Sequence, residues 1–197
     1  MTLAVEAMPD NLTVEEFMTL KPGGKELWQL VDGMPRQMVV NRMRQDLLAS
    51  ALGCVIGRHL KNMVDPLFVL PRIGVVPHVN ARHGIRAPDL SVVRPDIPDD
   101  ARWITGPVLV AEVLSGGNRA EPRSNVFALA SIPKLQEIVV LHSLMVRADV
   151  LRRQPDGEWP GNPEAVLEGD LVLGSIGFRT PLLHLYRNTR LHPGMVA

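Results

Sequence analysis

The sequence predicts a mixed α/β fold, in which one central mixed β-sheet is flanked by helices. Apolar residues recur at steps of three and four between Leu47 and Met63, which is the period of an amphipathic helix. Several shorter apolar segments have the length of strands, and they alternate with helical segments along the chain. The 197 residues suit one domain with a sizeable core, and we expect residues 1–11 to form a flexible arm.

Composition places the chain among ordinary globular proteins, with 46% hydrophobic and 21% charged residues. Lys plus Arg equals Asp plus Glu, so no overall field draws the chain to nucleic acid or to an anionic membrane. No signal peptide and no membrane-spanning segment is expected, and the predicted location is cytoplasmic. The single cysteine, Cys54, lies in the apolar helical pattern and is predicted to be a small core residue.

The N-terminal elements are predicted by local signals. Thr13 and Glu16 form a capping box for a short helix, and Leu12 and Phe17 occupy the positions of a hydrophobic staple. Residues 25–40 read as two strands joined at Asp32-Gly33, a dipeptide that favours a hairpin turn. The amphipathic helix then covers about residues 42–62.

Strand-like segments dominate the rest of the chain. A strand, a turn and a strand are expected over 67–95, and the continuous apolar run at 107–115 should be the central strand. A short helix at 121–131 has Pro122 near its first turn. The last predicted elements are two strands, a turn-rich excursion and a closing strand, turn and docking segment, at 135–143, 146–154, 155–163 and 167–186.

One carboxylate interrupts the predicted central strand. Strand alternation puts Glu112 on the same face as Val108, Val110 and Leu114, and an ionised carboxylate among core valines is costly unless it has a partner. A hydrogen-bond donor, a cation or a shifted pKa would resolve that cost. The alternative interpretation is a structural ion pair with an arginine.

A second carboxylate has a similar position. Asp89 enters a strand behind Pro88 and should point the same way as Ser91 and Val93. If the two strands are neighbours, Asp89 and Glu112 converge, and a divalent cation is the usual resolution of such a pair. Ligation by oxygen favours Mg²⁺ or Mn²⁺ over zinc. The alternative for Asp89 alone is a turn residue beside proline.

These residues lie in segments that carry a family likeness. "APDLSVVRPD", "VLVAEVLSGGNR" and "SIPKLQEIVVL", with "LVDG" and "ADVLRRQPDG", resemble the Uma-two family of restriction endonucleases, a branch of the PD-(D/E)xK nuclease superfamily. The resemblance covers nearly the whole chain. It implies a restriction-endonuclease-like core, in which Asp89 and Glu112 hold a metal ion that activates water and contacts the scissile phosphate.

The chain departs from the family pattern at two positions. The family has Glu just before its "LIDG", where this chain has Gln29, and a family lysine aligns with Asn125. Neither amide brings charge, and the missing lysine removes a cation expected to stabilise the transition state. Arg119 and Arg123 are candidate phosphate contacts in its place, with a solvated loop face as the alternative.

The first hypothesis is a Mg²⁺- or Mn²⁺-dependent endonuclease that cleaves DNA, with a degenerate site formed by Asp89, Glu112, Asn125 and Gln29. The second is an inactive nuclease-fold protein that binds nucleic acid or a protein partner. A third is a purely structural or regulatory homodimer. A homodimer also suits the first hypothesis, because nucleases of this fold often cut both strands as dimers.

Overall fold

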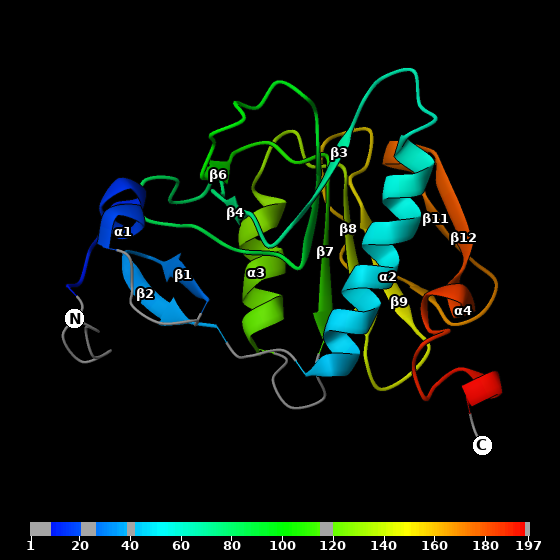
Figure 1. The fold of residues 1–197 in the computed structure, drawn as a ribbon. Helices are drawn as coiled ribbons and strands as arrows, with labels where there is room; N and C mark the ends of the chain where they lie inside the picture. Colours follow the sequence, from blue (N-terminus) through cyan, green and yellow to red (C-terminus); the bar gives the residue numbers. More distant parts are fainter. Residues whose placement is uncertain (1–8, 21–26, 39–41, 115–119, 196–197) are drawn as a thin grey trace.

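A six-stranded mixed sheet forms the centre of the computed structural model, which describes residues 9–20, 27–38, 42–114 and 120–195. Its strand order is β10-β9-β8-β7-β5-β3, so that β7 lies inside the sheet as the sequence predicts (Figure 1). The bounds are β3 Phe68–Pro71, β5 Leu90–Val93, β7 Leu109–Leu114, β8 Glu137–His142, β9 Ala148–Arg152 and β10 Glu164–Val166.

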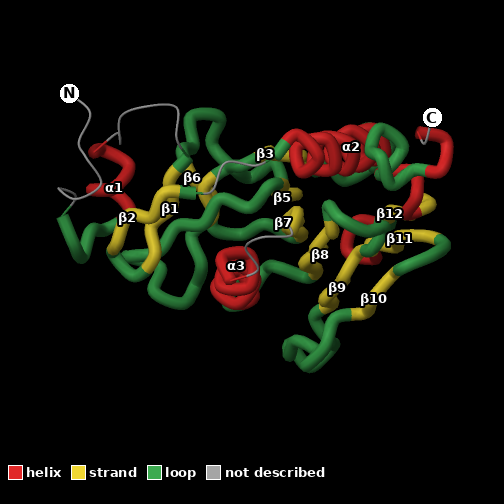
Figure 2. Tube along the Cα trace, turned by 90° about the horizontal axis from the view of Figure 1, so that it is seen from below, coloured by secondary structure: helices red, strands yellow, loops and turns green. Residues whose placement is uncertain are grey.

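Helices cover the two faces of this sheet. Figure 2 shows α2 (Met43–Leu60) on one side of the strands and α3 (Ala120–Ala130) on the other. The core under α2 contains Leu52, Leu109 and Val113, whereas the core under α3 contains Val110, Leu129 and Val140. Alternation along β7 therefore divides its side chains between two separate cores.

The pairing of β7 makes the sheet mixed. β7 runs parallel to β8, with Glu112 level with Val140, and antiparallel to β5, with Ala111 opposite Leu90. β5 is in turn antiparallel to the edge strand β3, where Pro71 lies opposite Leu90. The predicted neighbourhood of the Asp89 and Glu112 strands is confirmed by this order.

The N-terminal region forms its own small core beside α3 (Figure 1). Thr13 and Glu16 make both reciprocal bonds of the capping box, at 2.8 and 3.2 Å, at the start of α1 (Val14–Leu20). β1 (Trp28–Val31) and β2 (Met34–Gln37) form the predicted hairpin. Asp32 and Gly33 both have positive φ, 50° and 78°, which a two-residue turn of this kind requires. A short parallel pair, β4 (Gly74–Val75) with β6 (Trp103–Ile104), lies nearby.

The predicted long helix is confirmed as α2, but the prediction for Cys54 is wrong. The buried face of α2 carries Leu48, Leu52, Ile56 and Leu60, at steps of four residues. Cys54 lies midway between two of these positions, which turns it about half a helical turn from the core, and it is exposed.

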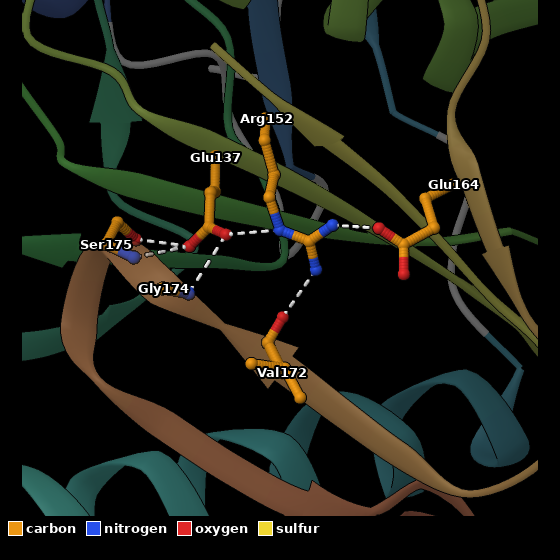
Figure 3. Close-up of polar contacts among 6 residues, drawn as sticks. All are labelled: Glu137, Arg152, Glu164, Val172, Gly174 and Ser175. Carbon is orange, nitrogen blue, oxygen red and sulfur yellow. Dashed lines mark hydrogen bonds and ion pairs between the residues drawn. The ribbon is translucent and has the colours of Figure 1, made fainter. Parts of the chain in front are cut away.

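A polar network fastens the C-terminal elements to the sheet (Figure 3). Glu137 of β8 accepts bonds from the backbone nitrogens of Gly174 and Ser175 and from Arg152 of β9. Arg152 also donates to the Val172 carbonyl. The network contacts β11 (Asp170–Leu173) and a 3₁₀ turn (Gly174–Ile176). The chain continues through β12 (Phe178–Pro181), α4 (Leu182–Leu185) and a final 3₁₀ turn (Pro193–Met195).

Within the described ranges, no helix combines the length and apolar character needed to cross a membrane. Residues 1–8 of the predicted arm lie outside those ranges, and the single-domain organisation stays a prediction.

Candidate functional site

Glu112 lies in the interior of β7, with 6% of its surface exposed. The side-chain nitrogen of Asn125, on α3, donates a hydrogen bond of 3.2 Å to its Oε1. Asn125 itself is 3% exposed, so both groups are removed from solvent. The α3 helix packs on the face of β7 that Glu112 shares with Val110, and this packing brings the two residues together. The buried carboxylate is thus oriented by a neutral donor.

Asp89 precedes β5 and is 9% exposed. Its Oδ2 accepts a hydrogen bond of 2.8 Å from the backbone nitrogen of Val113, the residue that follows Glu112. The paired residues of β5 and β7 end at Leu90 and Ala111. Just beyond that end, the Asp89 carboxylate accepts the Val113 N–H in the place of a backbone carbonyl of a neighbouring strand. This bond places Asp89 beside the β7 backbone next to Glu112, although the two acids are 23 positions apart in the chain.

The strand registers explain this meeting. Pro71, Leu90 and Ala111 are level with one another across β3, β5 and β7. One position further along each strand, the same alignment places Arg72, Asp89 and Glu112 in a row. One cation and two carboxylates thus follow the paired positions of three neighbouring strands, with Arg72 and Asp89 lining the cleft beside α2 and Glu112 bonded to Asn125 of α3.

Arg72 is a member of the site that the sequence prediction missed. Its Nε lies 3.5 Å from Oδ1 of Asp89, and its Nη2 lies 2.5 Å from Oδ1 of Asp46. No motif marks Arg72, because the contact depends on the register between β3 and β5. Asp46 is in the first turn of α2, so this guanidinium links the helix to the edge of the sheet.

The start of α2 also reaches this place. Gln45 donates from Nε2 to the carbonyl oxygen of Val113 at 3.3 Å, and its Oε1 accepts from the Arg42 backbone nitrogen at 3.0 Å. The backbone N–H of Val113 is thereby bonded to the side chain of Asp89, and its carbonyl oxygen to the side chain of Gln45.

A cleft of about 510 Å³ opens between α2 and the edge of the sheet, beside Asp89. Its polar lining residues are Asp46, Ser50, Cys54, Arg72 and Asp89.

The remaining predicted residues have different outcomes. Gln29 is 3% exposed in β1, next to Leu30, which bridges to Ile85 in the segment leading to Asp89. The prediction that Gln29 joins the carboxylates stays a prediction. Arg119 lies outside the described residues, and of Arg123 only the backbone, within α3, is described.

A further buried cation lies on the same segment. Arg86 donates from Nη1 to the carbonyl oxygen of Leu30, and burial lowers the pKa of its guanidinium below the ordinary value. The negative charge of Asp32 acts against this shift. Arg86 therefore fastens the hairpin to the strand that leads to Asp89.

The donor set fits a hard divalent cation better than zinc. Within the described residues, no group of three or more His, Cys, Asp or Glu side chains could hold a metal, so a closed protein cage is not formed there. Mg²⁺ typically takes one or two carboxylates and completes its shell with water or substrate phosphate. Asp89 and Glu112 supply that number of carboxylates, and both are already oriented by hydrogen bonds.

Comparisons with known proteins agree with this architecture. The family Uma2, described as "Putative restriction endonuclease", matches residues 14–178. A crystal structure of a protein from Anabaena variabilis, described as a "putative nuclease belonging to DUF820", is similar with a TM-score of 0.69 and 16% identity. That likeness covers 89% of this chain and 97% of the other, and it shows the same fold.

A curated relative is similar over a shorter stretch. The uncharacterized protein slr1290 of Synechocystis sp. is 38% identical over 74 residues, which is 36% of this chain. The match spans 39% of the length of that relative.

Proposed function

Because this chain belongs to the Uma2 family, we propose that it is a Mg²⁺- or Mn²⁺-dependent endonuclease that hydrolyses DNA phosphodiester bonds. The observation that carries the proposal is the hydrogen bond from the Val113 nitrogen to Asp89, which attaches this carboxylate to the residue that follows Glu112. The likeness to the Anabaena variabilis protein, itself described as a "putative nuclease", supports the same class of activity.

Asp89 and Glu112 are the proposed ligands. When bound, the ion would supply charge stabilisation at the scissile phosphate and a nucleophile from water. The Val113 N–H orients Asp89, and the Asn125 amide orients Glu112. Arg119 and Arg123 stay proposed phosphate contacts.

A second candidate function is a nuclease-fold binding module without turnover. Asn125 and Gln29 bring no charge to the site, and the guanidinium of Arg72 already lies 3.5 Å from Asp89. A cation in that position balances part of the charge that would otherwise attract a metal ion. Such a protein would bind nucleic acid or a protein partner through the same fold. In either case a homodimer remains our expectation.

Thermal melting with increasing Mg²⁺ or Mn²⁺ tests the metal site. An ion that binds the native state raises the melting temperature as its concentration rises. We expect this rise in the unchanged protein and its loss in Glu112→Gln. The matched control is Asp170→Asn, which removes a carboxylate from β11 instead, beside Arg179 at 3.7 Å.

Plasmid nicking then separates turnover from binding. Cleavage by the unchanged protein and by Asp170→Asn, with none by Glu112→Gln, supports the endonuclease. Metal and DNA binding without cleavage supports the binding module. Equal cleavage by all three proteins would rule out this site as its source, and the absence of any metal-dependent melting shift would remove the proposed metal.

A further inference from the structure

Two ion pairs hold the guanidinium of Arg72 at the edge of the sheet. Its guanidinium lies between two carboxylates, 2.5 Å from Asp46 and 3.5 Å from Asp89. The two acids come from different elements, α2 and the start of β5, so the arginine spans one wall of the 510 Å³ cleft. Its side chain still keeps 32% of its surface exposed toward solvent.

The backbone at Arg72 is in a conformation that arginine rarely adopts. Its φ of 47° lies in the left-handed region, where a side chain with a Cβ is unfavourable. Glycine or asparagine would adopt this conformation at lower cost. Residues held in this way concentrate at ligand-binding sites, where the surroundings fix the geometry. The strained backbone turns an arginine toward Asp89, and an unstrained turn residue would not supply that cation.

The chemistry around Arg72 suits a phosphate oxygen. Asp89 and Glu112 are anions, and the nearby amides of Asn125 and Gln45 are neutral, so a DNA phosphate approaching this row meets net negative charge. A guanidinium offers several N–H donors in a planar fork that matches phosphate oxygens. Because Asp46 lies at 2.5 Å and Asp89 at 3.5 Å, the contact with Asp89 is the longer of the two ion pairs.

We propose that Arg72 is a phosphate-binding residue of this site, which shields Asp89 when no cation is bound and turns its donors to a DNA phosphate when one is. Asp46 keeps the guanidinium at the cleft wall throughout. This inference rests on the proposed metal-dependent nuclease function. It assigns to the residue that follows β3, the edge strand, a part of the site that no sequence motif indicates.

Two variants separate the charge of Arg72 from its place in the backbone. Arg72→Asn removes the charge, and asparagine tolerates a positive φ better than other residues with a side chain of this kind. Arg72→Lys keeps the charge on a similar stem. Arg179→Asn is the matched control, because Arg179 is 70% exposed on β12 and contacts Asp170. Circular dichroism and melting establish that each variant is folded.

Mn²⁺ affinity, measured without DNA by electron paramagnetic resonance of the free ion, is the first readout. Arg72→Asn should bind Mn²⁺ about three- to tenfold more tightly, because a fixed positive charge a few ångströms away opposes the ion. Arg72→Lys and Arg179→Asn should stay close to the unchanged protein. An equal or weaker Mn²⁺ affinity in folded Arg72→Asn overturns the shielding of Asp89.

The salt dependence of DNA binding is the second readout. A labelled short duplex is titrated at several salt concentrations in saturating Ca²⁺, an oxygen-ligated divalent cation, and the duplex is checked afterwards for cleavage. Loss of one phosphate contact lowers the slope of log affinity against log salt by about one. We expect this reduction in Arg72→Asn and not in Arg72→Lys. If the unchanged protein binds neither Mn²⁺ nor DNA, the proposed function and this inference fail together. If it binds both and Arg72→Asn keeps the full slope, only this inference fails.

Discussion

The side chain of Asn125 donates a hydrogen bond of 3.2 Å to the carboxylate of Glu112, and both residues are buried between β7 and α3. A neutral donor at this distance lowers the cost of keeping an ionised carboxylate in a sheet core. The pair therefore depends on the N–H donor of the amide. This dependence can be tested by one isosteric substitution.

Asn125→Asp should destabilise the fold by about 2–4 kcal/mol near neutral pH, because two carboxylates then share one buried position. Mutual repulsion raises the folded-state pKa of the carboxyl pair. Stability should therefore be regained as the pH falls toward about 4, where unfolded carboxyls also take up protons. Urea unfolding across this pH range measures the effect. Asn162→Asp, at an exposed position, is the control, and an equal loss there would contradict the account.

The sequence was sufficient to predict the sheet, its central strand and the burial of Asp89 and Glu112, because alternation and apolar runs report burial directly. It was insufficient for Arg72, whose contact with Asp89 depends on the register of β3 against β5. The apolar period between Leu47 and Met63 also predicts a broader buried face for α2 than the structure has. Ala51 and Val55 flank the true buried row, and Cys54 was included with them although it points outward.

Val108 shows how a strand end can alter the alternation that places side chains. The sequence put Val108 on the same face as Val110 and Glu112, yet Val108 belongs to the core under α2. It precedes β7, and its backbone donates to Val92 and accepts from Gln136. Strict alternation therefore applies only from the first residue of the strand.

Substitutions at Glu137 and Glu164 test the network of Figure 3, since both side chains contact Arg152. The side chain of Glu137 is 3% exposed and also accepts from Gly174 and Ser175, whereas that of Glu164 is 61% exposed. Glu137→Gln should cost about 2–3 kcal/mol, since it leaves buried donors poorly matched. Glu164→Gln should cost less than about 1 kcal/mol, as an exposed ion pair does. Equal losses in denaturant unfolding would contradict the assignment.

Ionisation of Tyr186 should lower the free energy of unfolding at alkaline pH. Its hydroxyl lies 2.9 Å from the carbonyl oxygens of His142 and Arg147, to which it donates, and burial raises its pKa above 10.0. Because the pKa of Tyr186 is higher in the folded state, its neutral hydroxyl stabilises the fold fully when the pH is below the unfolded-state pKa. This stabilisation is lost as the pH rises through the folded-state pKa.

Tyr186→Phe should cost about 1–2 kcal/mol at neutral pH through the lost hydrogen bond. The gap between the two proteins should narrow above pH about 10. Unfolding curves at neutral and alkaline pH measure this gap. A gap that stays constant with pH would exclude the buried hydroxyl as the titrating group.

Two glycines should respond oppositely to alanine. At Gly33, φ is +78° and an added Cβ would lie 2.7 Å from the Cα atom of Asn11, so Gly33→Ala should cost about 1–3 kcal/mol. At Gly57, inside α2, an added Cβ meets nothing within 4 Å, so Gly57→Ala should stabilise by about 0.5–1 kcal/mol. Melting of the two variants side by side checks both signs, and a shift in the same direction would contradict the structure.

Calorimetric titration of Mn²⁺ into the unchanged protein, Asp89→Asn, Glu112→Gln and the double variant tests the central claim most directly. If the two carboxylates share one ion, each single variant should lose at least about tenfold in affinity, and the losses should not add in the double variant. Independent, additive losses, or binding unaffected by either substitution, would show that Asp89 and Glu112 do not hold a common metal.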